Sequence, residues 1–484
     1  MSGKSVAKNS IYNVLYKGFT ALFPLLTTAY ISRVLLADGV GKVAYANTVV
    51  SYFVTIAALG IPNYGVKLIA SQGDNNEKRS CAFYELIIIN SISTFICLIA
   101  YYFIVNFCGY FESKLPLLNV MGIMLFLNFF NIDWLYQGIE EYGYITSRSV
   151  IIKIISFIMM LAFVKNVDDY IIYAIILCLA TAGNYFWNFI NSKKYIVFVK
   201  VAQLDIKKHI KPVLILFASS VATEIYTMLD TIMLEYYHGD AVVGYYTNSV
   251  KIVRMVYTVT VAMVATFYPR ISSYYANNEK GKANELLSVG LKIILVIGIP
   301  AVIGLIGTSK YIVNILLGET FLPSVLILNI LSVLVLVFSI AYLLGHVVLM
   351  STGNENVIFI ATLIGAFTNA VINFLLIPRY GAVGAAAASV TAEIAVTIVM
   401  LIRSSFMFKL NLNKKFVLSI IVSTLIMTVV LVVTTNIVYS QTLNLIIIIL
   451  SCLMSYSMSL TITKNELALE VINKIKKLIL SFRN

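Results

Sequence analysis

The feature that most constrains this chain is a run of 48 residues, 416–463, without a single Asp, Glu, Lys or Arg. Other such runs include residues 43–66, 86–111, 170–192 and 356–378. A helix needs about 20 apolar residues to cross a bilayer, so each run can span it and 416–463 can do so twice. Only 12% of the 484 residues are charged and 60% are apolar, whereas ordinary soluble proteins have about 25% charged residues and under 50% apolar ones. A polytopic membrane protein is therefore predicted, and a soluble enzyme is excluded.

The spans are predicted to be α-helices, because continuous apolar runs lack the alternation of barrel strands. Charged and turn-rich breaks divide the chain into fourteen spans, and the long run is split at its only polar break, residues 439–444. The predicted fold class is thus an all-α polytopic membrane protein with about 14 transmembrane helices. The spans are placed at 10–35, 42–66, 83–106, 116–136, 145–164, 170–191, 212–235, 242–267, 286–308, 324–350, 356–377, 381–402, 416–438 and 443–462.

The distribution of Lys and Arg predicts the orientation, because short cytoplasmic loops collect positive charge. With the N-terminus inside, 25 of the 35 cations fall in cytoplasmic segments and six in external ones. This split supports an even number of spans and two cytoplasmic termini. It also explains the net charge of +13, which indicates topology and not binding of nucleic acid.

Several kinds of chemistry have no sequence signal. The five cysteines are dispersed without paired spacing and the three histidines do not cluster, so no metal or cofactor is predicted. The string Gly3-Lys4-Ser5 lacks the rest of a phosphate-binding loop, so no nucleotide-driven motor is expected. The longest stretch between spans, about 193–211, is too short for a separate domain. Any activity must therefore take place in the membrane, driven by gradients or by the fate of the substrate.

An internal repeat suggests two related bundles. Asn47 in AYANTV and Asn248 in YYTNSV are 201 residues apart, each near the outer start of a span and each preceded by Val-Gly. An even shift of six spans keeps both motifs in the same orientation. A third similar string, Ala382-Val-Gly384, does not fit this shift. The predicted domains are a six-helix lobe at 1–205, a second six-helix lobe at 206–405, two appended helices at 406–463 and an amphipathic cytoplasmic tail at 464–484.

Five strings in order give the chain a family resemblance. It resembles the Wzx-type polysaccharide flippases of the multidrug/oligosaccharidyl-lipid/polysaccharide exporter superfamily over about residues 10–405. Leu36 and Glu235 stand where that family usually has Gly, and Lys67 stands where it usually has Arg. Lys67 keeps the positive charge but lacks the planar fork with which arginine binds two phosphate oxygens. The strings are YISRVLLADGVG at 30–41, AALGIPNYGVK at 57–67, DWLYQGIEEYGYIT at 133–146, VGYYTNSVKIVR at 243–254 and IPRYGAVGAAAAS at 377–389.

The resemblance implies a transporter and not an enzyme. Such a protein flips undecaprenyl-pyrophosphate-linked oligosaccharide repeat units across the plasma membrane for O-antigen, capsule or exopolysaccharide synthesis. Its expected partners are that lipid-linked oligosaccharide, membrane lipids, a polysaccharide polymerase and glycosyltransferases, and a monomer is expected. Sugar and pyrophosphate cannot cross hydrocarbon, so the protein must offer a polar, cationic cavity. Ionisable residues within spans mark such a cavity, since each costs roughly 2.5–3.5 kcal/mol at the bilayer centre.

Depth within the spans ranks the ionisable candidates. The carboxylates near mid-span are predicted to couple transport to Na+ or H+ or to pair with cations, and the cations are predicted to bind pyrophosphate. Candidates nearer the ends of spans could instead anchor the helix at the membrane interface. The predicted anion-binding residues are Lys251, Arg254, Arg33 and Lys17, and the predicted coupling or charge-partner residues are Glu224, Glu393 and Asp230.

One group of charges is predicted to lie at a common depth. Glu224 comes about 14 residues before the turn near His238, and Arg254 comes about 15 residues after it. In a helix both would therefore lie about 22 Å from that turn. Lys251 lies one turn away from Arg254 on the same helix face. We expect Glu224 to hold one of the two cations in the empty state, and a pyrophosphate to compete for it.

Helix breakers predict moving parts. Pro24 lies mid-span in the first helix, and Pro300 interrupts the ninth together with three glycines. Bending at these hinge residues would serve alternating access, while the alternative is a pair of static kinks.

Three rival functions stay open. A multidrug or cation antiporter of the same superfamily would share the topology, and Glu224 and Glu393 would suit a bound cation. A lipid II flippase would carry the same pyrophosphate. A membrane glycosyltransferase or polymerase is less favoured, because neither a large external loop nor an Asp-x-Asp motif is present.

Overall fold

The computed structural model describes residues 6–73, 75–200, 204–408, 412–436 and 440–470, and no strand occurs among them. The predicted all-α fold is confirmed, since the described residues of each of the fourteen predicted spans are largely helical. Eleven segments of this described part are long and apolar enough to cross a membrane, and two of them, 26–71 and Glu355–Ser405, each pass a break that separates two predicted spans.

The chain forms two compact units, Met1–Thr247 and Asn248–Asn484. This division falls later than the predicted lobe boundary at 205, because α8 (Lys207–His238) packs against α1 (Val6–Ala58) and α2 (Ile61–Ser71). A compact unit and a sequence repeat are different divisions of a chain, so the lobe limits inferred from the repeat stay a prediction.

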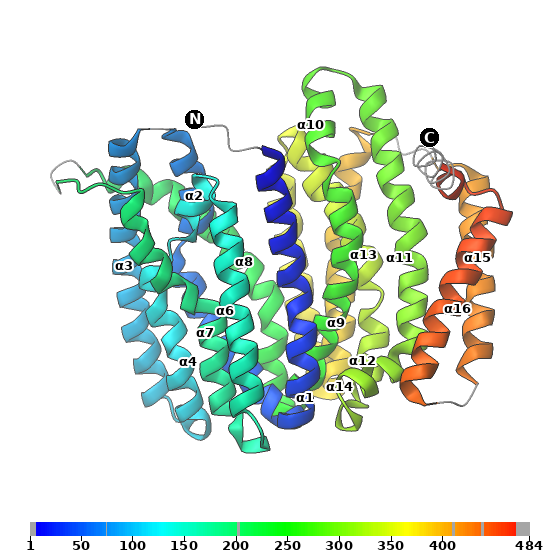
Figure 1. Cartoon of the computed structure of the whole chain (residues 1–484), viewed down its shortest axis with the longest axis horizontal. Coiled ribbons are helices and arrows are strands. Elements are labelled where there is room, and N and C mark those ends of the chain that lie inside the picture. Colours follow the sequence, from blue (N-terminus) through cyan, green and yellow to red (C-terminus); the bar gives the residue numbers. More distant parts are fainter. Residues whose placement is uncertain (1–5, 74, 201–203, 409–411, 437–439, 471–484) are drawn as a thin grey trace, which may run out of the picture. The chain divides into compact units, whose positions relative to one another are not determined.

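The helices of the first unit are coloured blue to green in Figure 1. After α1 and α2 they are α3 (Asn76–Phe107), α4 (Leu115–Leu127), α5 (Asp133–Gly138), α6 (Tyr142–Phe163), α7 (Tyr170–Asn191), α8 and the start of α9 (Asp240–Ala265), with 3₁₀ turns at Gly109–Lys114, Asn128–Phe130, Val167–Asp169 and Ser192–Lys194.

The second unit begins within α9 and continues through the yellow and red part of Figure 1. Its hairpin of α15 and α16 packs on α11, and both arms of the hairpin are close to each other along their length. The helices are α10 (Tyr268–Ala276), α11 (Lys280–Leu316), α12 (Ser324–Leu331), α13 (Leu334–Tyr342), the π-helix η7 (Leu343–Leu349), α14 (Glu355–Ser405), α15 (Lys414–Thr435) and α16 (Gln441–Ile462).

Two long helices are each broken at one residue with a positive φ. In α1 the break is Leu36 (φ 55°, ψ −173°), and in α14 it is Gly381 (φ 52°, ψ −132°). Glycine reaches such dihedral angles without steric cost, whereas leucine does not. Leu36 stands where the family that the sequence resembles is expected to have Gly, and this conformation gives a physical reason for that expectation. Gly384 follows the second break, and a side chain there would press on the backbone of Leu376.

Two predicted spans are not single α-helices. Span 116–136 divides into α4, a 3₁₀ turn and α5, and span 324–350 divides into α12, α13 and a π-helix. In the first case Asn128 is fully buried, and its side-chain amide donates to Asn90 Oδ1 (3.3 Å) and Thr94 Oγ1 (2.9 Å). Asn131 Nδ2 in turn donates to Asn128 Oδ1. These side-chain bonds hold the chain where the helix is interrupted, which apolar periodicity alone does not reveal.

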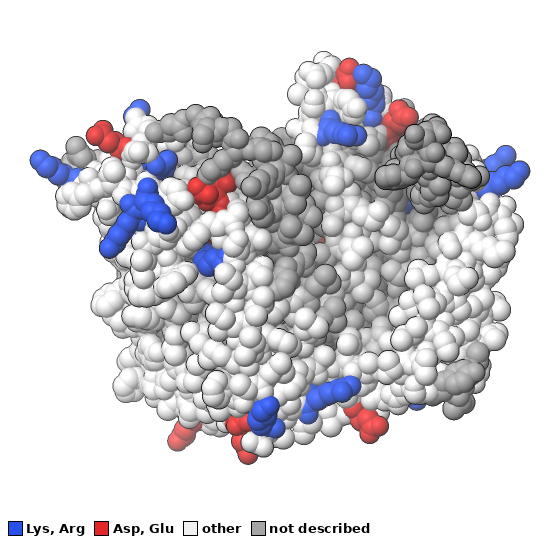
Figure 2. Space-filling model, viewed as in Figure 1, with Lys and Arg blue, Asp and Glu red and all other residues white. Residues whose placement is uncertain are grey.

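Charge and apolarity are separated as a bilayer requires. In Figure 2 the Lys, Arg, Asp and Glu side chains gather at the upper and lower margins, and the band between them is almost free of charge. Large apolar side chains are exposed on the helices, for example Phe95, Ile96 and Phe103 on α3. Lipid tails are the only surroundings in which such a surface is stable. The chain is a multi-pass membrane protein.

Part of the predicted amphipathic tail is described. Residues 466–470 are helical, and the remainder of the tail lies outside the described residues. Lys292 of α11 holds Glu466 in an ion pair (Nζ to Oε2, 2.6 Å). The Lys292 ammonium lowers the pKa of the Glu466 carboxyl, and the Asn413 amide contributes less. The start of the tail is therefore tied to the second unit.

Candidate functional site

Two of the predicted carboxylates lie on α8 in the first unit. Asp230 is buried, and the Tyr246 hydroxyl of α9 donates a hydrogen bond to its Oδ2. The Tyr52 hydroxyl of α1 lies within electrostatic range of both Asp230 and Glu224. The structure thus brings these two acidic groups near one tyrosine inside the bundle, where a carboxylate needs either a partner or a bound cation.

The two mid-span cations lie on α9 in the second unit. Lys251 is partly buried, and its Nζ donates to Asn248 Oδ1 at 3.4 Å. Arg254 lies one turn further along and is exposed. The helix places both cations on one face, as the spacing predicts. Glu224 belongs to the first unit, so the predicted contact of the two cations with it stays a prediction.

Glu393 lies on the second arm of α14 and is only 5% exposed. Two buried asparagines occupy the first arm of the same helix, where Asn373 Nδ2 donates to Asn369 Oδ1 (2.9 Å). Sequence reasoning did not select these asparagines. Their spacing of four within an otherwise apolar span was the available signal, because polar groups inside a membrane helix are costly unless they are paired.

The remaining candidates are placed less centrally. Arg33 is exposed, one turn before the break at Leu36. The side chain of Lys17 lies outside the described residues. Pro24 lies inside α1 and Pro300 lies inside α11. In α1 the backbone leaves helical dihedral angles at Leu36 and not at Pro24. A hinge role for the two prolines stays a prediction.

Glu235, where the related flippases usually have Gly, takes part in a cluster at the end of α8. Lys114 forms ion pairs with Glu235 and with Asp240 (2.7 Å to Oδ1). The Tyr110 hydroxyl donates to Glu235 at 2.5 Å, and the Lys114 ammonium lies 4.4 Å from the centre of the Tyr45 ring. The carboxylate is compensated by a cation and a phenol, which explains how a charge is accepted at this position.

Another buried polar cluster lies at the opposite end of α8, and sequence reasoning did not find it. Glu85 of α3 is 1% exposed. Its Oε2 meets His209 Nε2 at 2.7 Å, and its Oε1 accepts from Lys208 Nζ at 2.9 Å and from the Asp205 amide at 2.7 Å. On the far side of the imidazole, the Tyr64 hydroxyl lies 2.8 Å from Nδ1. In the neutral histidine, Tyr64 donates to Nδ1 while Nε2–H donates to Glu85.

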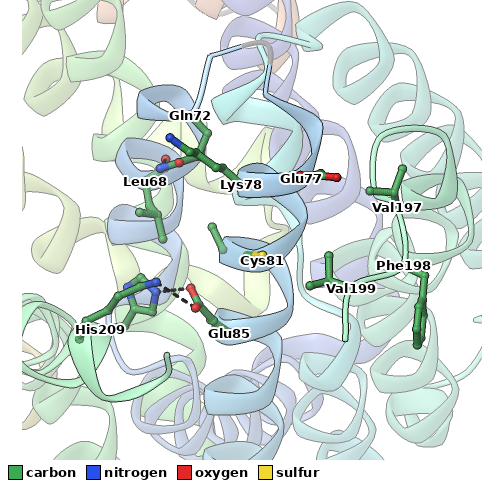
Figure 3. A pocket seen from close by; sticks show the side chains of 12 residues that line it. Leu68, Gln72, Glu77, Lys78, Cys81, Glu85, Val197, Phe198, Val199 and His209 are labelled. Carbon is green, nitrogen blue, oxygen red and sulfur yellow. Dashed lines mark hydrogen bonds and ion pairs between the residues drawn. The ribbon is translucent and has the colours of Figure 1, made fainter. Parts of the chain in front are cut away.

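This cluster forms one wall of a pocket of about 510 Å³ (Figure 3). Residues 197–199, which follow α7, and the first turns of α3 form the other walls, and Phe198 points away from Glu85 and His209. Both oxygens of Glu85 thus accept hydrogen bonds from residues at the start of α8. The hydrogen bonds fix the first turn of α8 to α3 and α2.

Asp133 of α5 belongs to an internal ion pair. Arg148 of α6 is 5% exposed, and its Nη2 lies 3.3 Å from Asp133 Oδ1. The Asn188 amide donates to the same oxygen, and the Tyr144 ring lies 5.4 Å from the guanidinium. No group of three or more His, Cys, Asp or Glu suited to a metal ion occurs in the part of the chain that the structure describes.

These features define a class of protein: an all-helical, multi-pass membrane protein whose spans carry buried acidic, amide and basic side chains, as transporters of polar solutes do. The family described as "Polysaccharide biosynthesis protein" matches residues 6–275, more than half of the chain. The chain belongs to that family. The family described as MatE also matches, over residues 216–375.

Individual relatives agree with this assignment. A protein of Shigella dysenteriae, named as an O-antigen transporter, is 23% identical over 399 residues, which cover 81% of this chain and 98% of the relative. An Escherichia coli K12 protein of the same name is 24% identical over 407 residues, covering 82% and 96%. The resemblance to Wzx-type flippases of the exporter superfamily is thus confirmed, and the chain is a membrane transport protein of the flippase type.

Solved structures share the fold. The lipid II flippase MurJ in an inward closed conformation superposes with a TM-score of 0.76 at 17% identity, over 94% of this chain and 99% of that one. An inward-facing multidrug transporter of the MATE family superposes with a TM-score of 0.64 at 14% identity, over 81% of this chain and 97% of that one. At these identities the likeness concerns the fold alone.

Proposed function

We propose that this protein flips undecaprenyl-pyrophosphate-linked oligosaccharide repeat units from the inner to the outer leaflet of the plasma membrane by alternating access. The observation that carries the proposal is the cation pair Lys251 and Arg254 on one face of α9, within a membrane-crossing segment. A pyrophosphate is the part of the substrate that such a pair would bind. The O-antigen transporters among the relatives support the substrate class.

The two cations are suited to different parts of the anion. Arg254 presents a planar guanidinium that can bind two phosphate oxygens at once, whereas Lys251 is a compact point charge. Arg33, towards the predicted outer end of the first span, would meet the pyrophosphate after flipping. Lys17, nearer the predicted cytoplasmic end, would meet it before.

The acidic residues supply the coupling. Glu224, Asp230 and Glu393 would exchange Na+ or H+ as the cavity changes its exposure, and Pro24 and Pro300 would act as hinges. The burial of Asp230 and Glu393 supports this role, because a buried carboxylate gains most from a bound cation. The protein would act as a monomer with both termini in the cytoplasm, between glycosyltransferases that supply its substrate and a polymerase that consumes its product.

The proposal is tested with purified protein in liposomes that contain a fluorescent undecaprenyl-pyrophosphate oligosaccharide. Flipping exposes the probe to a membrane-impermeant quencher, so the quenched fraction measures transport. We expect transport by the wild type and none by the Lys251→Ala, Arg254→Ala variant. Equal quenching with protein-free liposomes would contradict the proposal.

A second candidate is a cation-coupled multidrug antiporter. The match to the MatE family and the buried acidic residues favour it. In the same liposomes, efflux of an organic cation such as ethidium without movement of the lipid-linked sugar would support the antiporter. Flipping of lipid II in preference to the oligosaccharide lipid would support the third alternative, a lipid II flippase.

A further inference from the structure

The start of α8 is attached by polar side chains to segments that precede it in the chain. Glu85 of α3 accepts a hydrogen bond from Lys208 Nζ (2.9 Å) and lies 2.7 Å from His209 Nε2. The Tyr64 hydroxyl of α2 lies 2.8 Å from His209 Nδ1. These four residues are called the inner cluster.

The other end of α8 is attached in the same manner. Glu235 forms an ion pair with Lys114 and accepts a hydrogen bond from the Tyr110 hydroxyl at 2.5 Å. Both partners belong to the 3₁₀ turn Gly109–Lys114. Lys114 also pairs with Asp240, the first residue of α9 (2.7 Å). These four residues are called the outer cluster, and both clusters are formed at the same time in this structure.

The two clusters lie towards opposite surfaces of the membrane. His209 and Glu235 are 26 positions apart on one helix, which corresponds to about 39 Å at about 1.5 Å per residue. The hydrocarbon core of a bilayer is only about 30 Å thick. In the predicted orientation the inner cluster faces the cytoplasm and the outer cluster faces the external side.

The sequence repeat places α8 in the other half of the protein. It predicts that α8 is the first helix of the second lobe, 206–405, whereas both clusters connect α8 to residues of the first lobe, 1–205. A transporter of two lobes that works by alternating access opens the interface between them at one membrane surface at a time. The contacts of α8 with the first lobe would then break at one surface and persist at the other.

The chemistry of these contacts suits repeated opening. A hydrogen bond that opens to water is replaced by bonds to water, so its net contribution is small, whereas an apolar contact that opens exposes hydrocarbon surface. Among the described residues of α8, only Val213 belongs to the buried apolar cluster that contains Ile61 and Trp134. The inner cluster borders the pocket of about 510 Å³, and the Tyr110 side chain is 47% exposed. Water can therefore replace the bonds of both clusters.

We infer that the two clusters are the gates of this transporter. The inner cluster closes access from the cytoplasm, the outer cluster closes access from outside, and transport opens them in turn. The inference rests on the proposed function, because it needs two lobes that move against each other, and it adds the residues that hold each end closed.

Three variants that replace tyrosine by phenylalanine test the gates, because each removes one hydroxyl and almost no volume. Tyr64→Phe weakens the inner gate, and Tyr110→Phe weakens the outer gate. Tyr101→Phe is the matched control, since the Tyr101 hydroxyl donates to the Leu118 carbonyl (2.6 Å) within the first lobe.

Electron paramagnetic resonance measures the opening of each end as the distance between two spin labels on the full-length protein in nanodiscs. The inner pair is Lys78 with Lys211 and the outer pair is Ser113 with Tyr237, all exposed and outside the clusters. The five native cysteines are first replaced by alanine. Since a hydrogen bond contributes about 1 kcal/mol, each gate variant should populate the open distance at its own end roughly fivefold more than the wild type. The other end should stay closed, and Tyr101→Phe should change neither end.

Opening only at the end that lost its hydroxyl supports the gates. A gate variant that opened both ends together, or that opened its own end no more than Tyr101→Phe does, would mean that the clusters are static attachments of α8 and would overturn the inference. The flipping assay keeps the two proposals distinguishable. Label distances that respond as expected in a protein that flips no lipid-linked sugar would uphold the gates and count against the proposed substrate.

Discussion

Gly41 of α1 and Gly244 of α9 lie back to back, at a helix crossing that leaves no space for a side chain on either residue. A Cβ on Gly41 would overlap the carbonyl group of Asp240 and would lie 3.1 Å from the Gly244 amide nitrogen. A Cβ on Gly244 would in turn overlap the carbonyl group of Ala37. Close helix approach through small residues is a general means of packing membrane helices.

These contacts are reciprocal. Gly41 contacts Asp240, which is four residues before Gly244. Gly244 contacts Ala37, which is four residues before Gly41. A two-fold relation between two equivalent helices produces such a pattern. The crossing pairs Gly41 with Gly244, so it aligns the two Val-Gly strings. This alignment differs by two residues from the one that pairs Asn47 with Asn248.

The crossing predicts that alanine is not tolerated at either glycine. Gly41→Ala and Gly244→Ala should each destabilise the protein by about 1–3 kcal/mol or more, because backbone and not a flexible side chain occupies the space. The measurement is thermal unfolding in detergent. Gly304→Ala is the control, since nothing lies within 4 Å of a Cβ there. A control as unstable as the two variants would refute the steric explanation.

The break at Leu36 predicts a stabilising substitution. Leu36→Gly should raise the unfolding temperature, since the strain of a non-glycine residue in this region is about 1–3 kcal/mol and exceeds the entropic cost of glycine. At the corresponding break in α14, Gly381→Leu should lower it. If both substitutions shifted the unfolding temperature in the same direction, the strain argument would fail.

The Glu85 cluster predicts a graded loss of stability. Glu85→Ala leaves His209 buried without its acceptor and should cost about 3–5 kcal/mol. Glu85→Gln keeps an acceptor and should cost less. Lys208→Ala should cost at most about 1 kcal/mol, since the lysine side chain is 51% exposed. Unfolding temperatures measured side by side provide the ranking, and a Lys208→Ala loss equal to that of Glu85→Ala would contradict it.

Native cysteines can test the orientation. Cys108 is exposed beyond the end of α3, whereas Cys81 lines the pocket near the start of the same helix. A membrane-impermeant maleimide should label Cys108 from outside in intact cells, and Cys108→Ser should abolish that signal. Cys81 should react only in inside-out vesicles. Labelling of Cys81 in intact cells would reverse the predicted topology.

The cation pair on α9 predicts a defect in polysaccharide display with normal membrane insertion. Lys251→Ala or Arg254→Ala should abolish surface polysaccharide, and Arg254→Lys should restore only part of it because the planar fork is lost. Lys165→Ala, an exposed cation at the predicted external side, is the control. Normal display by the Lys251→Ala, Arg254→Ala variant would mean that the anion is held elsewhere.

Much of the fold followed from hydropathy and charge. The absence of charge over 416–463 placed two helices, and α15 and α16 lie there. The interruption of a helix at buried asparagines was not predicted from hydropathy. At Asn128 the helix is interrupted, because side chains 38 and 34 residues away bond to it.

The sequence by itself determined that the chain is all-helical and crosses the membrane many times, because both properties depend on the composition of about 20 consecutive residues. It also selected the charges that lie inside spans. Only the tertiary structure decided which of them meet. Glu85 and His209 are 124 positions apart, and their contact depends on how α3 and α8 are rotated towards each other. The glycine requirement at Gly41 likewise depends on another helix, since the carbonyl group of Asp240, 199 residues later in the chain, occupies the space of a side chain.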